Sequence, residues 1–410
     1  MRRRRGPKGE DTMKKRMAFV AATALAVVTT TAAHAQFKTQ GVTDSEIVIG
    51  THMDLSGPLK AWGVPAMNGV KIAVDEVNAN GGINGRKIRL VAEDDGYDPK
   101  KAVLATQKLI EKDNVFAIIS AMGSATTLAP LPIVLEAGIL HLFPITAAEF
   151  TYKMEPGKPQ ERLKFNNFLP YYDSLRIGMQ YLLADKKPKM PCIIYQDDEM
   201  GKNFTDAYKD SLKAAGMKEG VMVSYKRGAS DFASQVAKLK SEGCDLVALG
   251  SVVRESIAIV TTAKKAGYEP IYLSSSPTYV PDFPELGKEY AEGVYGVGSI
   301  DMLDPATASP KIKAFMDAYQ KAYGAPAGLQ STIGYNGIMT FAHYAALAGK
   351  DLKTEKVIEQ MESGKEFNDI FGQPPIKFSK DNHLGVASAL IAQVKDGKWK
   401  TIARNQTYSK

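Results

Sequence analysis

The strongest constraint in the sequence is a regular alternation of short apolar runs and amphipathic stretches that begins at Ile47. The runs "IVIGTHM", "KIRLVAEDD", "VFAIIS" and "ILHLFPIT" have the length of buried strands. Between them, "GVKIAVDEVNANGG" and "TLAPLPIVLEAG" have apolar residues at helical spacing, and Asp98-Pro99 before "KKAVLATQKLIEKDN" is typical of a helix start. Strands separated by such helices predict right-handed βαβ units and a parallel sheet.

The alternation stops at a polar, Pro- and Gly-bearing segment, residues 154–170, and then restarts with a second series that ends in "PIYLSS". This break predicts a second α/β domain. The glycine-bearing run "GVYGVGSI" (293–300) suits a crossover, and 308–349 is predicted to be helical with a loop near Gly324–Gly328. In the tail, "IKFSKDNHLG" and "ALIAQVKDGKW" predict antiparallel strands, with Asp396-Gly397 as a hairpin turn.

The net charge of +7 does not indicate a nucleic-acid-binding protein, because the basic excess is local. Eight basic and two acidic side chains lie within residues 1–35, and the remaining 375 residues have 44 basic and 43 acidic side chains.

The same N-terminal residues have the pattern of a secretory signal. "MKKRM" from Met13 is a positive region, "AFVAATALAVVTTTAA" is an apolar region short for a membrane span, and Ala33-His34-Ala35 has the small-x-small form of a cleavage site. We therefore expect residues 1–35 to be removed, with the stretch before Met13 an over-called start, and the mature chain to begin at Gln36 in the periplasm. A membrane anchor is the less favoured alternative.

Cys192 and Cys244 are the two cysteines of the chain, and each adjoins an apolar run. Buried free thiols are the expectation, and a bridge is the alternative that the export signal permits.

Motifs of catalysis and metal binding are absent. The sequence contains no G-x-x-x-x-G-K-[ST], G-x-S-x-G or H-E-x-x-H motif, and its five histidines are scattered. The acidic "EDDGYD" does not have the spacing of a calcium loop. We therefore predict a binding protein rather than an enzyme, with neither metal nor cofactor.

The stretch "FAIISAMGSATTLAP" ends an apolar strand in small and hydroxylated residues. A helix that begins there would offer unpaired backbone N–H groups, and Gly123 would let a ligand approach them. Ser124 and Thr126 add hydroxyl groups. Such residues can hold a carboxylate without a lysine, or they can simply cap a helix. The residues alone leave both interpretations open.

From about Ile47 to Trp399 the chain resembles the periplasmic solute-binding proteins of ABC importers, of the leucine/isoleucine/valine-binding type. The pieces that resemble this family are "IVIGTHMDLSGPLKAWG", "GVKIAVDEVNANGGINGRKIRLVAEDDGYDPKKAV", "GSATTLAPLPIVLEAGIL" and "FPITAAEF".

The resemblance implies an α/β type I periplasmic binding protein with two doubly wound parallel-sheet lobes. Three crossovers, near 167–169, 295–298 and 371–374, would join them. Residues 44–168 plus 297–372 would form lobe 1, and residues 169–296 plus 373–408 would form lobe 2. The ligand would lie between the lobes, which close by a hinge motion, and would pass to a permease and an ATPase at the inner membrane. A monomer is expected.

The resemblance also implies a set of ligand-binding residues. Ser124 would hold the ligand carboxylate, Trp62 would line the side-chain pocket, the "FPITA" loop would hold the ligand backbone, and Glu255 would pair with an α-ammonium group. The full predicted set is Trp62, Gly123, Ser124, Thr126, Ile145, Thr146, Ala147, Met200, Val252, Arg254 and Glu255.

Departures from the family pattern leave the ligand open. Met200 and Val252 stand where tyrosines commonly bracket the amino acid, and the family's frequent disulfide would join Tyr97 and Gly123, so it is absent. If Glu255 faces the cleft, a branched-chain amino acid fits. If Glu255 pairs with Arg254, an aromatic or aliphatic acid of the benzoate or phenylpropanoid type fits instead. A sensor of the same fold is a further alternative.

Overall fold

The computed structural model describes residues 37–274, 276–386 and 388–408. These residues fall within one compact unit, Phe37–Lys410. The predicted signal segment, residues 1–35, lies outside the described residues. Among the residues that are described, no helix combines the length and the apolar character needed to cross a bilayer.

The first sheet has five parallel strands in the order β2-β1-β3-β4-β5. The strands are β1 (Glu46–Met53), β2 (Lys87–Asp94), β3 (Ala117–Ile119), β4 (Leu140–Leu142) and β5 (Lys164–Phe165). In β1, Gly50 lies opposite Val91 of β2 on one side and Ile118 of β3 on the other. Because β1 has a neighbouring strand on each side, Ile47–Met53 is buried throughout, which agrees with the apolar residues at its start.

Capping residues and prolines in the local sequence explain where the helices around the first sheet begin and end. They are α1 (Lys60–Ala79), α2 (Pro99–Glu111), α3 (Ser124–Leu128) and α4 (Leu131–Glu136), with 3₁₀ turns η1 (Glu149–Thr151) and η2 (Pro159–Leu163). Asp98 caps α2 through its carboxylate, as predicted. The single helix predicted from "TLAPLPIVLEAG" is wrong. Pro130 and Pro132 lack the N–H group that a continuous helix needs, so α3 ends and α4 begins anew.

The second sheet has seven strands in the order β12-β11-β10-β9-β8-β6-β7. They are β6 (Pro191–Gln196), β7 (Met222–Tyr225), β8 (Leu246–Gly250), β9 (Ile271–Ser274), β10 (Tyr295–Gly298), β11 (Ala389–Lys395) and β12 (Lys398–Gln406). Strands β6 to β10 run parallel, and β11 and β12 form an antiparallel hairpin. Asp396 and Gly397, with φ of 54° and 69°, form the predicted hairpin turn.

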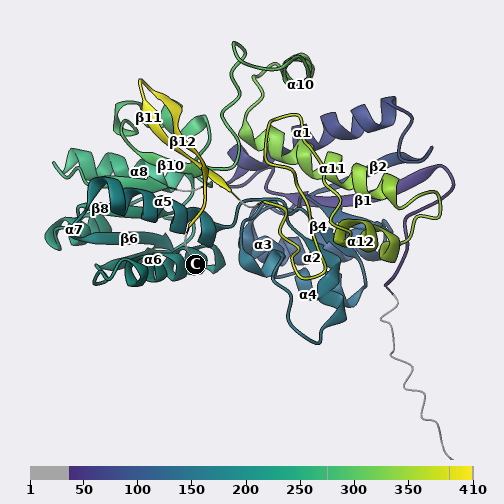
Figure 1. The fold of residues 1–410 in the computed structure, drawn as a ribbon, viewed down its shortest axis with the longest axis horizontal. Helices are drawn as coiled ribbons and strands as arrows, with labels where there is room; N and C mark the ends of the chain where they lie inside the picture. The colour runs from purple at the N-terminus through teal and green to yellow at the C-terminus, as the bar shows by residue number, and fades with distance from the viewer. Residues whose placement is uncertain (1–36, 275, 387, 409–410) are drawn as a thin grey trace, which may run out of the picture. The chain divides into compact units, whose positions relative to one another are not determined.

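The helices around this sheet are α5 (Tyr171–Lys186), α6 (Glu199–Ala214), α7 (Ala233–Ser241), α8 (Val253–Lys265) and α9 (Asp282–Gly287), followed by the turn η3 (Lys288–Tyr290). The chain then forms α10 (Pro310–Tyr323), α11 (Leu329–Leu347) and α12 (Thr354–Glu362). Figure 1 shows α11 lying along α1. A Cβ atom on Gly334 would come within 2.1 Å of the Ala66 carbonyl oxygen, so glycine is required at this close contact.

Two segments differ from the predicted crossovers. The "GVYGVGSI" run contributes β10, so the chain leaves the second sheet after Gly298. Residues that follow the third predicted crossover, 371–374, still contact the first sheet: Phe378 packs against Phe143 and Phe165, and the Gly385 N–H donates to the Asn166 carbonyl. The predicted strand "IKFSKDNHLG" therefore packs on the first sheet with isolated bridges only. The complete lobe bounds stay a prediction.

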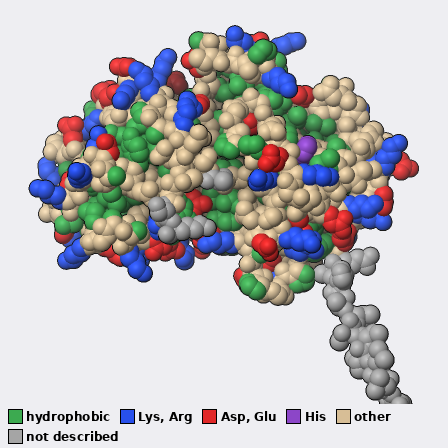
Figure 2. Space-filling model, viewed as in Figure 1, with side chains coloured by type: hydrophobic (Ala, Val, Ile, Leu, Met, Phe, Trp, Pro, Cys, Tyr) green, Lys and Arg blue, Asp and Glu red, His purple; other side chains and the backbone are tan. Residues whose placement is uncertain are grey.

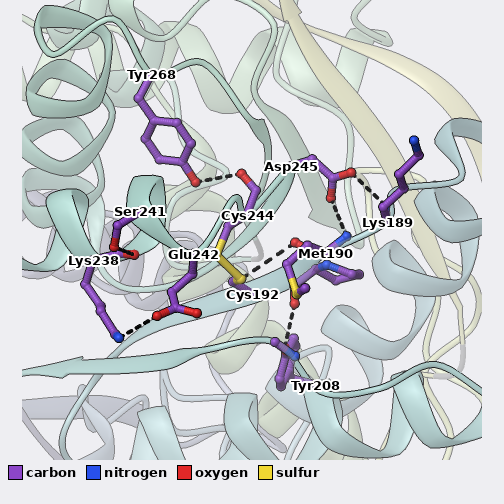
Figure 3. Close-up of a disulfide and its surroundings, with 12 residues drawn as sticks. Lys189, Met190, Cys192, Tyr208, Lys238, Ser241, Glu242, Cys244, Asp245 and Tyr268 are labelled. Atoms are coloured by element: carbon purple, nitrogen blue, oxygen red, sulfur yellow. Dashed lines mark hydrogen bonds and ion pairs between the residues drawn. A yellow bond between two sulfur atoms is a disulfide. The ribbon is translucent and has the colours of Figure 1, made fainter.

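Cys192 and Cys244 form a disulfide, which corrects the expectation of free thiols. Their Cα atoms lie 5.8 Å apart, because the parallel pairing of β6 with β8 brings two residues 52 positions apart together. Figure 3 shows the bridge beside Asp245, whose carboxylate accepts hydrogen bonds from the N–H groups of Lys189 and Met190. The disulfide thus lies at the amino ends of β6 and β8.

Acidic and basic side chains are interspersed over the face of the molecule shown in Figure 2. This mixture agrees with the small charge excess of residues 36–410 in the sequence.

Candidate ligand-binding site

A small cavity lies among loops that follow the carboxyl ends of strands in both sheets. Parallel α/β sheets place their ligand sites at this edge. The cavity has a volume of about 40 Å³. The residues that line it are Leu59, Trp62, Tyr97, Met122, Gly123, Ser124, Ile145, Phe168, Tyr171, Met200, Val252 and Pro277. None of these described residues has a charged side chain.

Three hydroxyl groups gather at one side of the cavity, and we call them the hydroxyl cluster: Ser124, Thr146 and Tyr171. The Oγ atom of Ser124 lies 2.7 Å from Oγ1 of Thr146. Burial raises the pKa of Tyr171, while hydrogen bonds from Thr146 and Ser124 oppose the rise. The Tyr171 hydroxyl therefore stays protonated at neutral pH and can donate a hydrogen bond.

The loops after β3 and β4 are tied together, and this positions the hydroxyl cluster. The Gly123 N–H donates to the Ile145 carbonyl, and the Ile145 N–H donates to the Ala121 carbonyl. Ser124 opens α3, whose first internal hydrogen bond runs from the Thr127 N–H to the Gly123 carbonyl. The first N–H groups of a helix have no carbonyl in a preceding turn. They are therefore available to a ligand, although α3 has only five residues.

Tyr97 fills the place where the family resemblance locates a disulfide partner of Gly123. A Cβ atom on Gly123 would lie 2.7 Å from the Tyr97 ring. Tyr97 itself has a φ of 59°, and its N–H donates to the Asp95 carboxylate at 2.8 Å. The guanidinium group of Arg227 lies over the Tyr97 ring, 4.7 Å from its centroid. The ring is thus fixed as a wall of the cavity.

Trp62 joins elements of the two sheets across the cavity. Its indole nitrogen in α1 donates to the Pro277 carbonyl, in the loop after β9, at 3.1 Å. Tyr97 makes a similar contact, because its hydroxyl lies 3.4 Å from the Gln196 amide at the end of β6. Both aromatic side chains are buried. The conformation is therefore a closed one.

A scan of the sequence against protein-family models matches the periplasmic binding protein model over residues 46–398. The chain belongs to the periplasmic binding protein family. This periplasmic binding protein is 26% identical over 373 residues to Leu/Ile/Val-binding protein homolog 8 of Brucella abortus (strain 2308), with 87% of this chain and 90% of the relative covered.

Solved structures share its fold. One is the branched-chain amino acid transporter substrate-binding protein LivJ of Streptococcus pneumoniae in complex with isoleucine, with a TM-score of 0.72 and 23% identity over 88% of this chain and all of that one. Another is a solute-binding protein of R. palustris in complex with benzoate, with a TM-score of 0.77 and 18% identity over 88% and 97% of the two chains. The predicted family, leucine/isoleucine/valine type and type I fold are confirmed, and this family consists of extracytoplasmic binding proteins rather than enzymes.

Six of the predicted site residues of this periplasmic binding protein line the cavity: Trp62, Gly123, Ser124, Ile145, Met200 and Val252. Five do not. Thr146 does not line the cavity and contacts the lining residues Ser124 and Tyr171, and the Thr126 hydroxyl donates to the Met122 and Gly123 carbonyls. Ala147 offers its carbonyl to the Tyr171 N–H.

Arg254 and Glu255 also lie outside the cavity lining. The Arg254 guanidinium donates to the Glu255 carboxylate at 2.6 Å. The Arg254 side chain is 51% exposed and that of Glu255 only 4%. Burial raises the pKa of Tyr225, and the charge of the Glu255 carboxylate also raises it. The second Glu255 oxygen is buried and has no hydrogen-bond partner among the described residues.

Sequence reasoning missed half of the cavity lining: Leu59, Tyr97, Met122, Phe168, Tyr171 and Pro277. All follow a strand and precede or begin a helix. The rule that ligands bind at the carboxyl ends of parallel strands could have found Leu59, Tyr97, Met122 and Pro277, because the strands before them were predicted. It could not have found Phe168 and Tyr171, because β5 lies in the segment 154–170 that was predicted to be a break between the domains.

Proposed function

We propose that this periplasmic binding protein is the substrate-binding component of an ABC importer and captures a small apolar carboxylate in the cavity. The observation that carries the proposal is an apolar cavity whose described lining has the hydroxyl groups of Ser124 and Tyr171 and no charged side chain. A buried carboxylate needs hydrogen-bond donors. The isoleucine and benzoate named for the two solved relatives are both small apolar carboxylates, which supports this class. A permease and an ATPase would receive the ligand.

Thermal-shift screening tests the proposal, because a ligand that binds only the native state raises apparent stability. Titration calorimetry of Ser124→Ala with the best acid should show affinity about tenfold or more weaker, since a hydrogen bond to a charged group contributes about 1.5–3 kcal/mol.

Ser211→Ala is the matched control, because Ser211 is also a buried serine but bonds the Ala207 carbonyl within α6. It should bind like the parent protein. A Ser124→Ala protein that binds like the parent would mean that residues 121–130 only cap a helix.

A further inference from the structure

We infer that Arg227 is a positioning residue for ligand retention: it holds the ring of Tyr97, a cavity-wall residue from the first sheet, against the second sheet and so keeps the cavity closed. Arg227 itself does not line the cavity. We call the residues around it the Arg227 cluster: Gln196, Asp198, Tyr225 and Arg227. The inference rests on the proposed function and adds to it the residues that determine how long a ligand is held.

Tyr97 follows β2 in a backbone conformation that a tyrosine rarely adopts, with a φ of 59°. The Asp95 carboxylate holds this conformation. One of its oxygens accepts the Tyr97 N–H at 2.8 Å, and the other lies 2.8 Å from Nδ1 of His52 in β1. Asp95 and His52 are both buried. Such strain persists only where surrounding contacts fix it, and it is frequent at functional positions. The first sheet therefore fixes the position from which the Tyr97 ring extends.

The Tyr97 ring contacts loops of both sheets. On the first sheet it packs so closely on Gly123 that a Cβ atom there would lie 2.7 Å from the ring. On the second sheet, the Arg227 guanidinium lies 4.7 Å from the ring centroid, within the range of a cation–π interaction. The Gln196 amide donates to the Tyr97 hydroxyl at 3.4 Å. The contacts with Arg227 and Gln196 can form only when the two sheets are close, so they stabilise the closed form.

Strand ends and one carboxylate position the Arg227 cluster. Gln196 ends β6 and lies opposite Tyr225, which ends β7. The Asp198 carboxylate accepts hydrogen bonds from the Gln196 amide at 2.5 Å and from the Arg227 guanidinium at 3.1 Å. The same carboxylate caps α6. The guanidinium group is thus held in place by the second sheet before Tyr97 reaches it.

The Arg227 cluster does not satisfy its own polar groups. Oε1 of Gln196, the hydroxyl of Tyr225 and Nε of Arg227 are buried and have no hydrogen-bond partner among the described residues. Buried polar atoms without partners are rare and call for an explanation. Burial raises the pKa of Tyr97, and the charge of Asp198 also raises it, so the Tyr97 hydroxyl keeps its proton. A cluster that is incomplete within its own sheet is suited to bind this polar ring from the other sheet.

The arrangement has a kinetic consequence. Ligand enters the open form, in which Tyr97 and Arg227 are apart, and it can leave only after their contact has broken. Weakening this contact should therefore raise the dissociation rate and leave the association rate almost unchanged.

Stopped-flow measurement of tryptophan fluorescence, to which Trp62 in the cavity wall contributes, tests the inference with valine, isoleucine, butanoate and benzoate as probes. For each probe that binds, Arg227→Met should speed dissociation about two- to thirtyfold, because a cation–π contact is lost. Association should stay within about twofold of the parent rate. Arg227→Lys keeps a cation near the ring and should restore most of the slow dissociation.

Lys226→Met is the matched control. It removes the same charge from the neighbouring position, but Lys226 is exposed and pairs with Asp197 instead. It should release ligand at the parent rate.

A double-mutant cycle separates an effect through Tyr97 from a general structural effect of Arg227. In the Tyr97→Leu background, Arg227→Met should cause no further increase in the dissociation rate. An undiminished effect in that background, or parent-like dissociation in Arg227→Met, would overturn the inference and leave the proposed function standing. If the parent protein bound none of the four probes, the proposed function would fail and the inference with it.

Discussion

Gly123 shows how one residue shapes the candidate site. Its φ is 95°, and a Cβ atom there would lie 2.5 Å from the Thr126 hydroxyl and 2.7 Å from the Tyr97 ring. We expect Gly123→Ala to lower the free energy of unfolding by about 1–3 kcal/mol and to weaken ligand binding, because Tyr97 must move. Urea denaturation and calorimetry measure the two effects.

Gly364→Ala is the control for this substitution. Gly364 has a φ of 75° and open space where the Cβ atom would be, so it reports the backbone strain alone. Equal losses of unfolding free energy in the two variants would show that the contact between Gly123 and Tyr97 does not contribute to stability.

We expect His141 in β4 to make the stability of the folded protein depend on pH. Burial, together with the nearby His52 and Lys164, lowers the pKa of His141 from 6.5 to about 3. The unfolded chain therefore binds a proton that the folded protein does not. Stability is greatest above pH 6.5 and falls as the pH decreases toward 3, by at most about 1.4 kcal/mol per pH unit for this group. Urea denaturation at pH 7.5, 6.5 and 5.5 should show a flatter dependence for His141→Gln, and parallel curves would contradict this.

The disulfide acts at the level of elements, by joining the amino ends of β6 and β8. Met200 and Val252 follow the carboxyl ends of these strands, so the bridge and the cavity lie at opposite ends. We expect the double variant Cys192→Ala/Cys244→Ala to lose about 2–4 kcal/mol of stability and to keep its ligand affinity. Dithiothreitol should lower the melting temperature of the parent only. A large loss of affinity in the double variant would show that the bridge holds the cavity in shape.

Closure is a property of the whole molecule and depends on contacts outside the cavity lining. The Gln330 amide of α11 donates to the Asp282 carboxylate of α9 at 2.8 Å, and the Glu149 N–H donates to Asn203 of α6 at 3.0 Å. We expect Gln330→Ala to weaken ligand binding about two- to tenfold without touching the ligand, because the closed form loses one hydrogen bond.

Small-angle scattering checks the mechanism of this effect. Ligand should reduce the radius of gyration of the parent protein, and Gln330→Ala should need more ligand for the same change. Gln320→Ala, at an exposed position of α10, should behave like the parent. Identical scattering with and without saturating ligand would contradict hinge closure.

Local sequence determined most of the strands and helices, because apolar periodicity, caps and turn residues act within a few residues. The Asp98 cap, the Asp396-Gly397 turn and the buried run of β1 are examples. The prolines at 130 and 132 were equally local signals that the predicted helix overlooked. The family and type I fold also followed from the sequence, through the order of its motifs.

Only the tertiary structure decided which residues contact one another. The Cys192–Cys244 bridge, the packing of Phe378 against the first sheet and the pairing of Glu255 with Arg254 all depend on strand register and on side-chain direction. So does the cavity, half of whose lining comes from residues that were not in the predicted set. The sequence determined which segments become strands and helices, because hydrogen bonding and periodicity are local. The three-dimensional packing decided which polar groups face one another across the cavity, because that depends on residues far apart in the chain.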